Sequence, residues 1–209
     1  ISYPAYWQTE LLKKGIEREV CAIGGPCTSY ELVAHDQTEV AFCGQDSAVL
    51  RMMRETLTTS YYHISLTNDV IGLESAVALK NAYALGVALT IGLVNRYLGA
   101  DAGLHYNSQA AAFYQAVKEM RRLLAIQGAT FDCENIGIGD LYVTVYGGRT
   151  RKIGILLGEG KRYDEAMEIL AGVTLESLVV ARRVAKAIYR KAELGQVDLK
   201  DFPMLVHVE

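Results

Sequence analysis

The sequence predicts a mostly α-helical protein in which a short α/β segment is followed by an all-helical domain. Two observations predict this division. In residues 1–67, short apolar runs alternate with turn residues, which is typical of the strands and helices of an α/β sheet. In residues 68–209, apolar residues recur at helical spacing throughout. We therefore place a domain boundary near Thr67.

The α/β segment is predicted to contain three strands and one helix. The strands are Val20–Ile23, Glu39–Gly44 and Tyr61–Leu66, each bounded by turn residues. Residues 46–58 carry leucine and methionine at helical spacing, with Asp46 or Ser47 as the cap. We take two or three strands as too few for an independent sheet. Because the chain also begins at isoleucine rather than methionine, we expect sequence to be missing before it.

The helical domain is predicted to begin with a long, buried central helix. Asn68 or Asp69 caps it, and it runs to about Leu98. Its uncharged run, Asn81–Asn95, is about one turn too short to cross a bilayer, so we expect no membrane span. Its glycines are expected where neighbouring helices approach the backbone closely. They are Gly72, Gly86 and Gly92.

Three further helices are predicted, over residues 107–128, 162–171 and 177–192. Gly172 and Gly195 would end the last two of them. The glycines between Gly137 and Gly148 predict a loop.

The composition excludes several classes of protein. The 209 residues include 21 basic and 24 acidic ones, so the net charge is −3. A sequence-independent nucleic-acid binder needs a basic face, so only a local basic patch is compatible with such contacts. Apolar residues make up 51%, which is ordinary for a globular chain and too much for a disordered one.

The cysteines and histidines predict no metal centre and no disulfide framework. No CxxC spacing occurs, and the four histidines are scattered. We expect free thiols in a reducing cytoplasm. The cysteines are Cys21, Cys27, Cys43 and Cys133.

Lys80 is the first candidate for chemistry, because it lies inside the most apolar predicted helix. A buried ammonium must be paired or lose its proton, and a lysine so tuned can serve as a general acid or base. The alternative is a lysine whose stem crosses apolar surface while its head reaches water. Glu74 is offset from Lys80 by roughly 240° around the helix, so the two are not expected to pair.

Two further segments suggest chemistry. Asp140 lies among glycines and is either a helix cap or a carboxylate that orients Lys80. Gly147–Lys152 combines two glycines, a hydroxyl and three cations, which suits a phosphate cradle at a helix start. The alternative there is a solvated basic turn. The spacing does not match a P-loop, and no GxGxxG fingerprint occurs in the chain.

These residues resemble NAD(P)-dependent glycerol-3-phosphate dehydrogenases. Asn68–Glu74 followed by Ala78–Asn81 is similar to the family's D-V-I-G-V-E…A-L-K-N segment. Gly139–Lys152 is similar to its G-D-L…T…S-R-N-R segment, and Gly25–Cys27 to its G-P-S turn. The likeness extends from about Gly24 to Pro203. Thr150 replaces the usual asparagine and Cys27 the usual serine.

The resemblance implies a fold and an organisation. Residues 1–67 would be the C-terminal end of a Rossmann-type dinucleotide-binding domain, namely its last β/α/β elements. Residues 68–209 would form an all-helical substrate-binding and dimerisation domain, a bundle like that of 6-phosphogluconate dehydrogenase.

The resemblance also implies site residues. Lys80 would be the acid/base at the substrate's C2 oxygen, and Asp140 would orient it. Glu176 would lie near the nicotinamide, and Arg149 is a second candidate for cofactor contact. The residues that would bind the substrate are Asn81, Thr144, Arg149 and Thr150.

The implied activity is the interconversion of glycerol 3-phosphate and dihydroxyacetone phosphate with NAD or NADP, by a cytoplasmic homodimer. Because the glycine fingerprint is not in the chain, we expect the isolated chain to be inactive. The alternative is a non-catalytic helical interaction or regulatory module that retained the fold.

Overall fold

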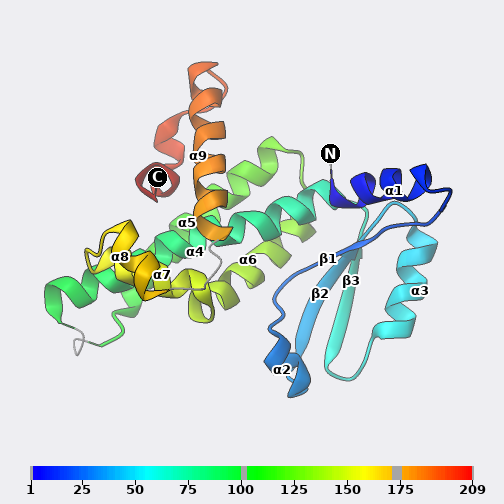
Figure 1. Cartoon of the computed structure of the whole chain (residues 1–209), viewed down its shortest axis with the longest axis horizontal. Helices are drawn as coiled ribbons and strands as arrows, with labels where there is room; N and C mark the ends of the chain where they lie inside the picture. Colours follow the sequence, from blue (N-terminus) through cyan, green and yellow to red (C-terminus); the bar gives the residue numbers. More distant parts are fainter. Residues whose placement is uncertain (1, 100–102, 171–175, 209) are drawn as a thin grey trace. The chain divides into compact units, whose positions relative to one another are not determined.

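The structure, a computed structural model, describes residues 2–99, 103–170 and 176–208, apart from the side chains of residues 131, 176 and 208. Helices dominate it, with a small three-stranded sheet near the N-terminus, which confirms the predicted fold class (Figure 1). The chain divides into two compact units. Unit 1 comprises Ile1–Val77 and Leu123–Asp140, and unit 2 comprises Ala78–Arg122 and Leu141–Glu209. The domain boundary near Thr67 stays a prediction.

The sheet of unit 1 contains the predicted strand–helix–strand order. Its strands are β1 (Ala22–Gly24), β2 (Thr38–Cys43) and β3 (Tyr62–Thr67), in that spatial order. β1 is antiparallel to β2, whereas β2 and β3 are parallel and joined through α3 (Ser47–Leu57). Asp46 caps α3 by accepting the backbone N–H groups of Ala48 and Val49.

The two faces of the sheet bury different side chains, as the alternation of a strand requires. On one face, Val40, Phe42 and Ile64 pack with Leu50 of α3. On the other face, Ala41 and Cys43 pack with residues from the beginnings of α4 (Val70–Leu98) and α6 (Phe131–Tyr146). Those residues are Val70, Leu73 and Cys133.

Asp69 fixes the beginnings of both helices on this second face. Its Oδ1 accepts the N–H of Gly72 at 2.7 Å and so caps α4, as predicted. Its Oδ2 accepts the N–H of Thr130, the residue before α6, also at 2.7 Å. One carboxylate therefore satisfies free N–H groups at two helix ends.

Two helices of unit 1 were not predicted. They are α1 (Tyr3–Lys13) and the five-residue α2 (Ser29–Val33). The N–H of Tyr3 donates to Glu74 Oε1 at 3.0 Å, which ties α1 to α4. Glu74 thus has a partner within unit 1, and the expectation that it does not pair with Lys80 stays a prediction.

The predicted loop from Gly137 to Gly148 is wrong, because α6 continues through Tyr146. Buried positions recur along this segment at helical spacing, and they are residues 133, 137, 140, 141 and 145. A Cβ on Gly139 would lie 3.3 Å from Pro26 Cγ, so packing against a distant turn favours glycine there. Such packing outweighs the cost of about 1 kcal/mol for a glycine in a helix. Asp140 therefore lies inside a helix and does not cap one.

Unit 2 is built on a close contact between α4 and α7 (Arg149–Gly158). A Cβ on Gly92 would overlap the carbonyl oxygen of Ile155 and lie 2.8 Å from Gly158 Cα. A Cβ on Gly158 would in turn overlap the carbonyl oxygen of Leu89. The predicted close approach is confirmed at Gly92. At Gly72 the crowding comes instead from the cap residue Asp69.

Three further helices agree with the predicted segments, namely α5 (Tyr106–Ile126), α8 (Tyr163–Ile169) and α9 (Glu176–Glu193). A 3₁₀ turn (Leu199–Asp201) and α10 (Pro203–Val208) were not predicted. Gly195 follows α9 with a φ of +68°, as expected of a glycine that ends a helix. Gly172 lies outside the described residues.

By length and composition alone, α4 could cross a membrane. Of its most apolar 18-residue window, 56% is buried within the structure. The core helix of a globular protein meets the same criterion. That α4 does not span a membrane therefore stays a prediction.

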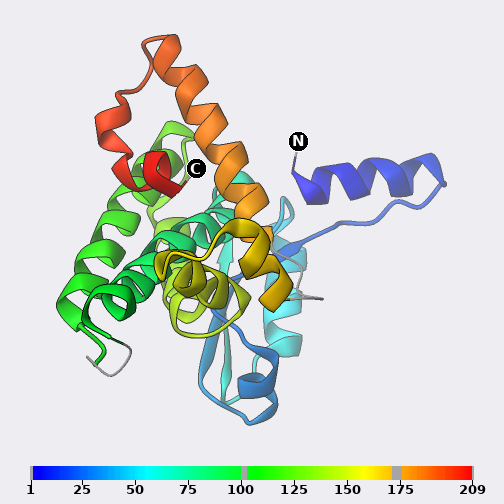
Figure 2. The same ribbon diagram turned by 60° about the vertical axis from the view of Figure 1, so that its left-hand side comes forward.

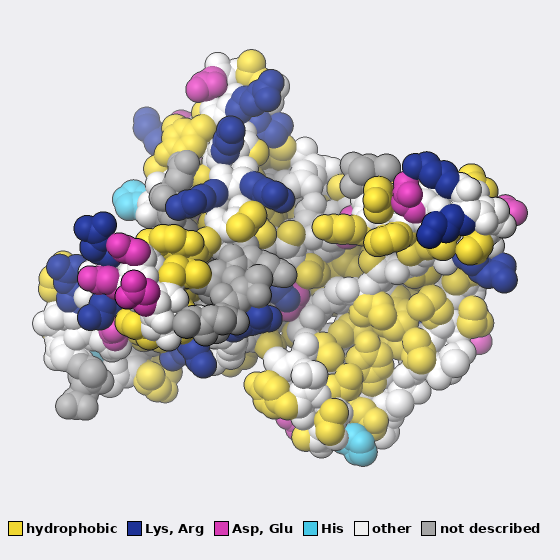
Figure 3. All heavy atoms as spheres, viewed as in Figure 1, with side chains coloured by type: hydrophobic (Ala, Val, Ile, Leu, Met, Phe, Trp, Pro, Cys, Tyr) yellow, Lys and Arg dark blue, Asp and Glu magenta, His cyan; other side chains and the backbone are white. Residues whose placement is uncertain are grey.

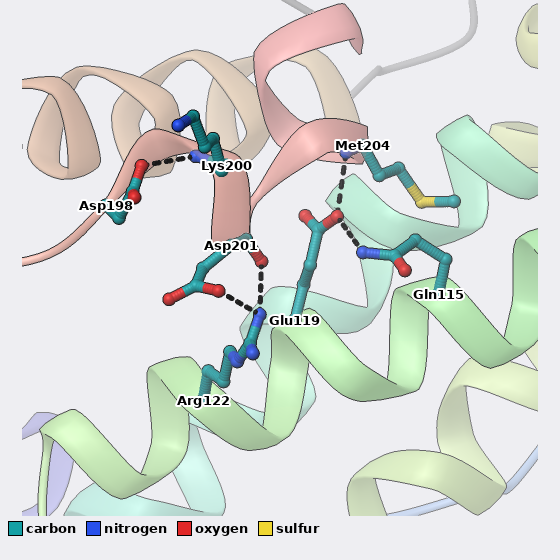
Figure 4. Close-up of polar contacts among 7 residues, drawn as sticks. All are labelled: Gln115, Glu119, Arg122, Asp198, Lys200, Asp201 and Met204. Atoms are coloured by element: carbon teal, nitrogen blue, oxygen red, sulfur yellow. Dashed lines mark hydrogen bonds and ion pairs between the residues drawn. The ribbon is translucent and has the colours of Figure 1, made fainter.

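A buried carboxylate holds the C-terminal segment of the chain against α5 (Figures 2 and 4). Glu119 is fully buried, and its two oxygens accept the N–H groups of Met204 at 2.7 Å and Leu205 at 3.1 Å. The side chain of Gln115 donates a third hydrogen bond at 2.8 Å. One turn along α5, Arg122 forms an ion pair of 2.8 Å with Asp201.

Burial sets the electrostatics of this cluster. Desolvation raises the pKa of Glu119, and the hydrogen bonds from Gln115, Met204 and Leu205 offset part of that rise. The pKa of the Tyr83 hydroxyl is also raised by burial, with a further contribution from the charge of Glu119. Among the described residues, the Tyr83 hydroxyl has no hydrogen-bond partner.

Replacing Gly92 by alanine should destabilise unit 2 by about 2 kcal/mol or more, because the added methyl group meets the backbone of α7. Chemical denaturation of both proteins measures the difference. Gly139→Ala is the matched control, because its methyl group meets only the Pro26 ring at 3.3 Å and should cost less. Equal stability of the two variants would contradict the close helix contact.

Glu119→Ala should destabilise the protein by about 2 kcal/mol, because the N–H groups of Met204 and Leu205 lose their acceptor. The raised native pKa means that Glu119 stabilises the fold most below its ordinary pKa of 4.5, and less as pH rises through the native pKa. The difference in the free energy of unfolding between wild type and Glu119→Ala should therefore become smaller from acidic to neutral pH. Urea denaturation at several pH values measures it.

Asp201→Asn is the control for this pH dependence. Its ion pair is about half exposed, so its loss should cost no more than about 1 kcal/mol. A Glu119→Ala difference that widens as pH rises would show that the pKa of Glu119 is lowered in the native state.

Candidate functional site

Lys80 and Asn81 lie side by side in sequence on α4, and both side chains are half-buried. Lys80 is therefore less buried than the apolar sequence around it led us to expect. Half-burial is also compatible with a lysine whose stem crosses apolar surface while its head reaches water, so both interpretations of Lys80 stay predictions.

Asp140 is a buried carboxylate inside α6, with only 2% of its surface exposed. Thr144 follows one turn later on the same helix and is half-buried. Aspartate is rarely buried without a structural or functional reason. Because Asp140 belongs to unit 1 and Lys80 to unit 2, their pairing stays a prediction.

The segment around Arg149 forms a helix start, and the choice between a phosphate cradle and a solvated basic segment stays a prediction. Gly148 occupies the N-cap position of α7 with a φ of +119°, a conformation that favours glycine. Arg149 is the first residue of the helix and is exposed, whereas Thr150 is buried. A ten-residue helix that begins with free N–H groups beside an exposed arginine can accept a phosphate.

The three cations of this segment are not equivalent. Arg151 Nη1 donates to the carbonyl oxygen of Val145 at 3.2 Å, in the last turn of α6. Arg149 and Lys152 are exposed. Arg151 thus joins α7 to α6, and Arg149 is the better placed of the two arginines for a ligand.

Glu176 begins α9, and its side chain lies outside the described part of the chain. The next residue, Ser177, is buried, and its hydroxyl has no hydrogen-bond partner among the described residues. The proposed contact of Glu176 with a nicotinamide stays a prediction.

The charge of Asp140 acts on the Cys27 thiol within unit 1. Partial burial raises the pKa of Cys27, and the carboxylates of Asp140 and Glu31 raise it further. The turn before Cys27 places Gly25 with a φ of +135°, and a Cβ there would lie 3.1 Å from Val40 Cα. The Gly25–Cys27 turn and the Asp140 helix therefore belong to one electrostatic environment.

The cysteines are free thiols. Burial raises the pKa of Cys43 to about 11, with smaller contributions from Glu74 and the neighbouring thiols. In the described ranges, no group of three or more histidine, cysteine or acidic side chains is arranged to hold a metal ion.

Sequence reasoning missed a cavity of about 310 Å³ in unit 1. It lies between the Ala41 face of the sheet and the first turns of α6, and it is lined by Glu39, Ala41, Ser65, Leu66, Thr67, Leu73, Asp132, Cys133, Asn135 and Ile136. The cavity depends on the register that sets Ala41 opposite Ser65, and on α6. The one sequence signal was the acidic and amide residues at helical spacing, Asp132 and Asn135.

A local basic patch, which the composition allowed, lies on α9 (Figure 3). It consists of the exposed side chains of Arg182, Arg183, Lys186 and Arg190. Their spacing places them within roughly 100° of arc around the helix. Tyr163 lies 5.9 Å from the guanidinium of Arg182.

Comparison with known proteins gives a consistent result. A family model described as NAD-dependent glycerol-3-phosphate dehydrogenase C-terminus matches residues 69–209. The NADP(+)-dependent glycerol-3-phosphate dehydrogenase of Archaeoglobus fulgidus is 32% identical over 202 residues, which cover 94% of this chain and 57% of the relative. A glycerol-3-phosphate dehydrogenase [NAD(P)+] of Acidobacterium capsulatum is 30% identical, covering 88% of this chain and 52% of the relative.

Solved structures give the same picture. The glycerol-3-phosphate dehydrogenase of Coxiella burnetii matches with a TM-score of 0.72 and 26% identity, over 90% of this chain and 54% of that one. The enzyme of Saccharomyces cerevisiae matches with a TM-score of 0.75 and 24% identity, over 98% of this chain and 57% of that one. The chain thus spans about half the length of the relatives it matches.

Proposed function

The chain belongs to the NAD-dependent glycerol-3-phosphate dehydrogenase family, and from this premise we propose that it supplies the substrate-binding and acid/base residues of such an oxidoreductase. The reaction would interconvert glycerol 3-phosphate and dihydroxyacetone phosphate with NAD(H) or NADP(H). The observation that carries the proposal is the helix start at Gly148 with its exposed Arg149, a cationic position suited to a substrate phosphate. A cytoplasmic homodimer is part of the same proposal.

The residues present do not form a dinucleotide site by themselves. In the described part of the chain, the glycine turn that follows β1 leads into α2, which has only five residues and whose cap residue Thr28 makes no side-chain cap. A pyrophosphate site needs a glycine turn at the start of a longer helix. The roles that we develop for this chain lie on the substrate side, and the contacts of Glu176 and Arg149 with a cofactor stay predictions.

On the substrate side, Lys80 would act at the C2 oxygen. In the reducing direction the ammonium would give its proton to that oxygen as the carbonyl becomes an alcohol, and in the oxidising direction the neutral amine would take it back. Asp140 would favour the ammonium form and hold its orientation. Asn81, Thr144 and Thr150 would hydrogen-bond the rest of the substrate, and Arg149 its phosphate.

The alternative is a non-catalytic helical interaction or regulatory module. The missing dinucleotide turn within the described residues and the basic patch on α9 are compatible with it. It predicts that Lys80 and Arg149 have no kinetic role, so the following variants distinguish the two functions.

In a full-length enzyme that contains this chain, Lys80→Ala should lower the kcat for dihydroxyacetone phosphate by about two to four orders of magnitude. The midpoint of thermal unfolding should change little. Lys80→Arg should remain slow, because a guanidinium keeps the charge but does not release its proton. Lys118→Ala, which removes an exposed lysine of α5, is the control. A near-normal kcat for Lys80→Ala would exclude the acid/base role.

Arg149→Ala should raise the KM for dihydroxyacetone phosphate by roughly tenfold to a hundredfold, because a charge-assisted contact contributes about 1.5–3 kcal/mol. Lys152→Ala, an exposed cation one turn further on, should have a smaller effect. Steady-state kinetics with the substrate varied measure both. An unchanged KM for Arg149→Ala would leave the helix start without a role in phosphate binding.

A further inference from the structure

We propose that the cavity of unit 1 is a binding site for a small organic cation, an ammonium that carries a short apolar body. None of its lining residues belongs to the site proposed for the phosphorylated substrate. The proposal therefore does not rest on the proposed function, and each can fail without the other.

The floor of the cavity is apolar and small. Ala41 and Leu73 belong to the buried cluster beneath the sheet, with Cys133 beside them and Ile136 packed against it. At about 310 Å³, the cavity is at the lower end of the range for small-molecule sites. It suits a ligand with a compact hydrocarbon part of a few carbon atoms.

The rim is polar, and part of it has no partner within the protein. Glu39 Oε1 accepts the hydroxyl of Ser65 at 2.8 Å, so one carboxylate oxygen is oriented by the neighbouring strand. Among the described residues, Glu39 Oε2 and the side chains of Asp132 and Asn135 make no hydrogen bond or ion pair. All three side chains are exposed to solvent at the mouth of the cavity, so a donor that enters the cavity can replace water at these acceptors.

The charge of the lining selects the class of ligand. Two carboxylates, Glu39 and Asp132, border the cavity, and no lysine or arginine is among its lining residues. An anion such as a phosphate would be repelled. A metal ion is disfavoured, because the described residues contain no suitable group of three ligands.

The beginning of α6 carries the partial positive charge of a helix N-terminus, which opposes a cation. That charge is already met in part by Asp69, whose Oδ2 accepts the N–H of Thr130. Two full negative charges at the rim exceed the remaining partial charge. The balance favours an ammonium head between Glu39 and Asp132, with its carbon atoms over Ala41 and Leu73.

The test uses three probes of one shape: isobutylammonium, isobutanol and isobutyrate. Calorimetric titration of the purified protein at neutral pH and low salt should show saturable binding of isobutylammonium. Isobutanol should bind at least about tenfold more weakly, and isobutyrate should not bind, because the charge supplies the preference. Equal binding of the ammonium and the alcohol, or binding of isobutyrate, would overturn the proposal.

Variants locate the binding. Glu39→Gln and Asp132→Asn should each reduce the affinity for isobutylammonium by about tenfold and remove most of its advantage over isobutanol. Glu55→Gln, an exposed acid on α3 that does not line the cavity, is the matched control and should bind as wild type. Both cavity variants are nearly isosteric, and their thermal midpoints report whether the fold is intact. The proposal would be contradicted if both cavity variants still preferred isobutylammonium to isobutanol. It would also be contradicted if Glu55→Gln lost as much affinity as they do, because the binding would then lie elsewhere.

Discussion

The arrangement of unit 1 depends on the carboxylate of Asp69. Its two oxygens accept N–H groups that begin different helices, from Gly72 in α4 and from Thr130 before α6. The first turns of these helices are thereby fixed beside the end of β3, where they cover the Ala41 face of the sheet. The same helices carry Lys80 and Asp140 further along. Within unit 1, the clamp sets the rotation of the first turns of α6, and with it the direction in which Asp140 leaves the helix.

Glu119 and Asp140 are both buried carboxylates. Glu119 accepts hydrogen bonds from Gln115, Met204 and Leu205, so its acceptor capacity is used to hold the C-terminal segment. Asp140 lies within the segment that resembles the family's G-D-L motif. Both are acids within predominantly apolar helices, and sequence alone does not separate a structural acid from a functional one. For Glu119 the structure shows a structural role, since Met204 and Leu205 lie more than 80 residues away along the chain, whereas the role of Asp140 stays a prediction.

Local signals allowed much of the fold to be predicted. The strand–helix–strand order and the long α4 follow from periodicity, and the caps at Asp46 and Asp69 follow from residue type. The helix α6 could not be predicted, because its glycines resemble a loop and are explained only by the approach of Pro26. The helix α1 gave little signal, since Tyr3, Trp7 and Leu12 remain exposed. Lys80, Asp140 and the segment that contains Arg149 were singled out by an apolar helix, a glycine-flanked acid and a glycine-and-cation pattern, and the resemblance added their proposed roles. The cavity beside Glu39 was missed because it needs the pairing register of two strands.

The contact between Gly92 and Gly158 has a consequence for positional accuracy. Most helix contacts are made by side chains, which adjust by changing rotamer when a helix slides. Here peptide groups meet directly, and a peptide group has no rotamer to change. Sliding of α7 is resisted by hard-core repulsion rather than by side chains that yield. The backbone of Arg149, the first residue of α7, is therefore held in place by this contact. Its guanidinium changes position only through rotation about the bonds of its own side chain.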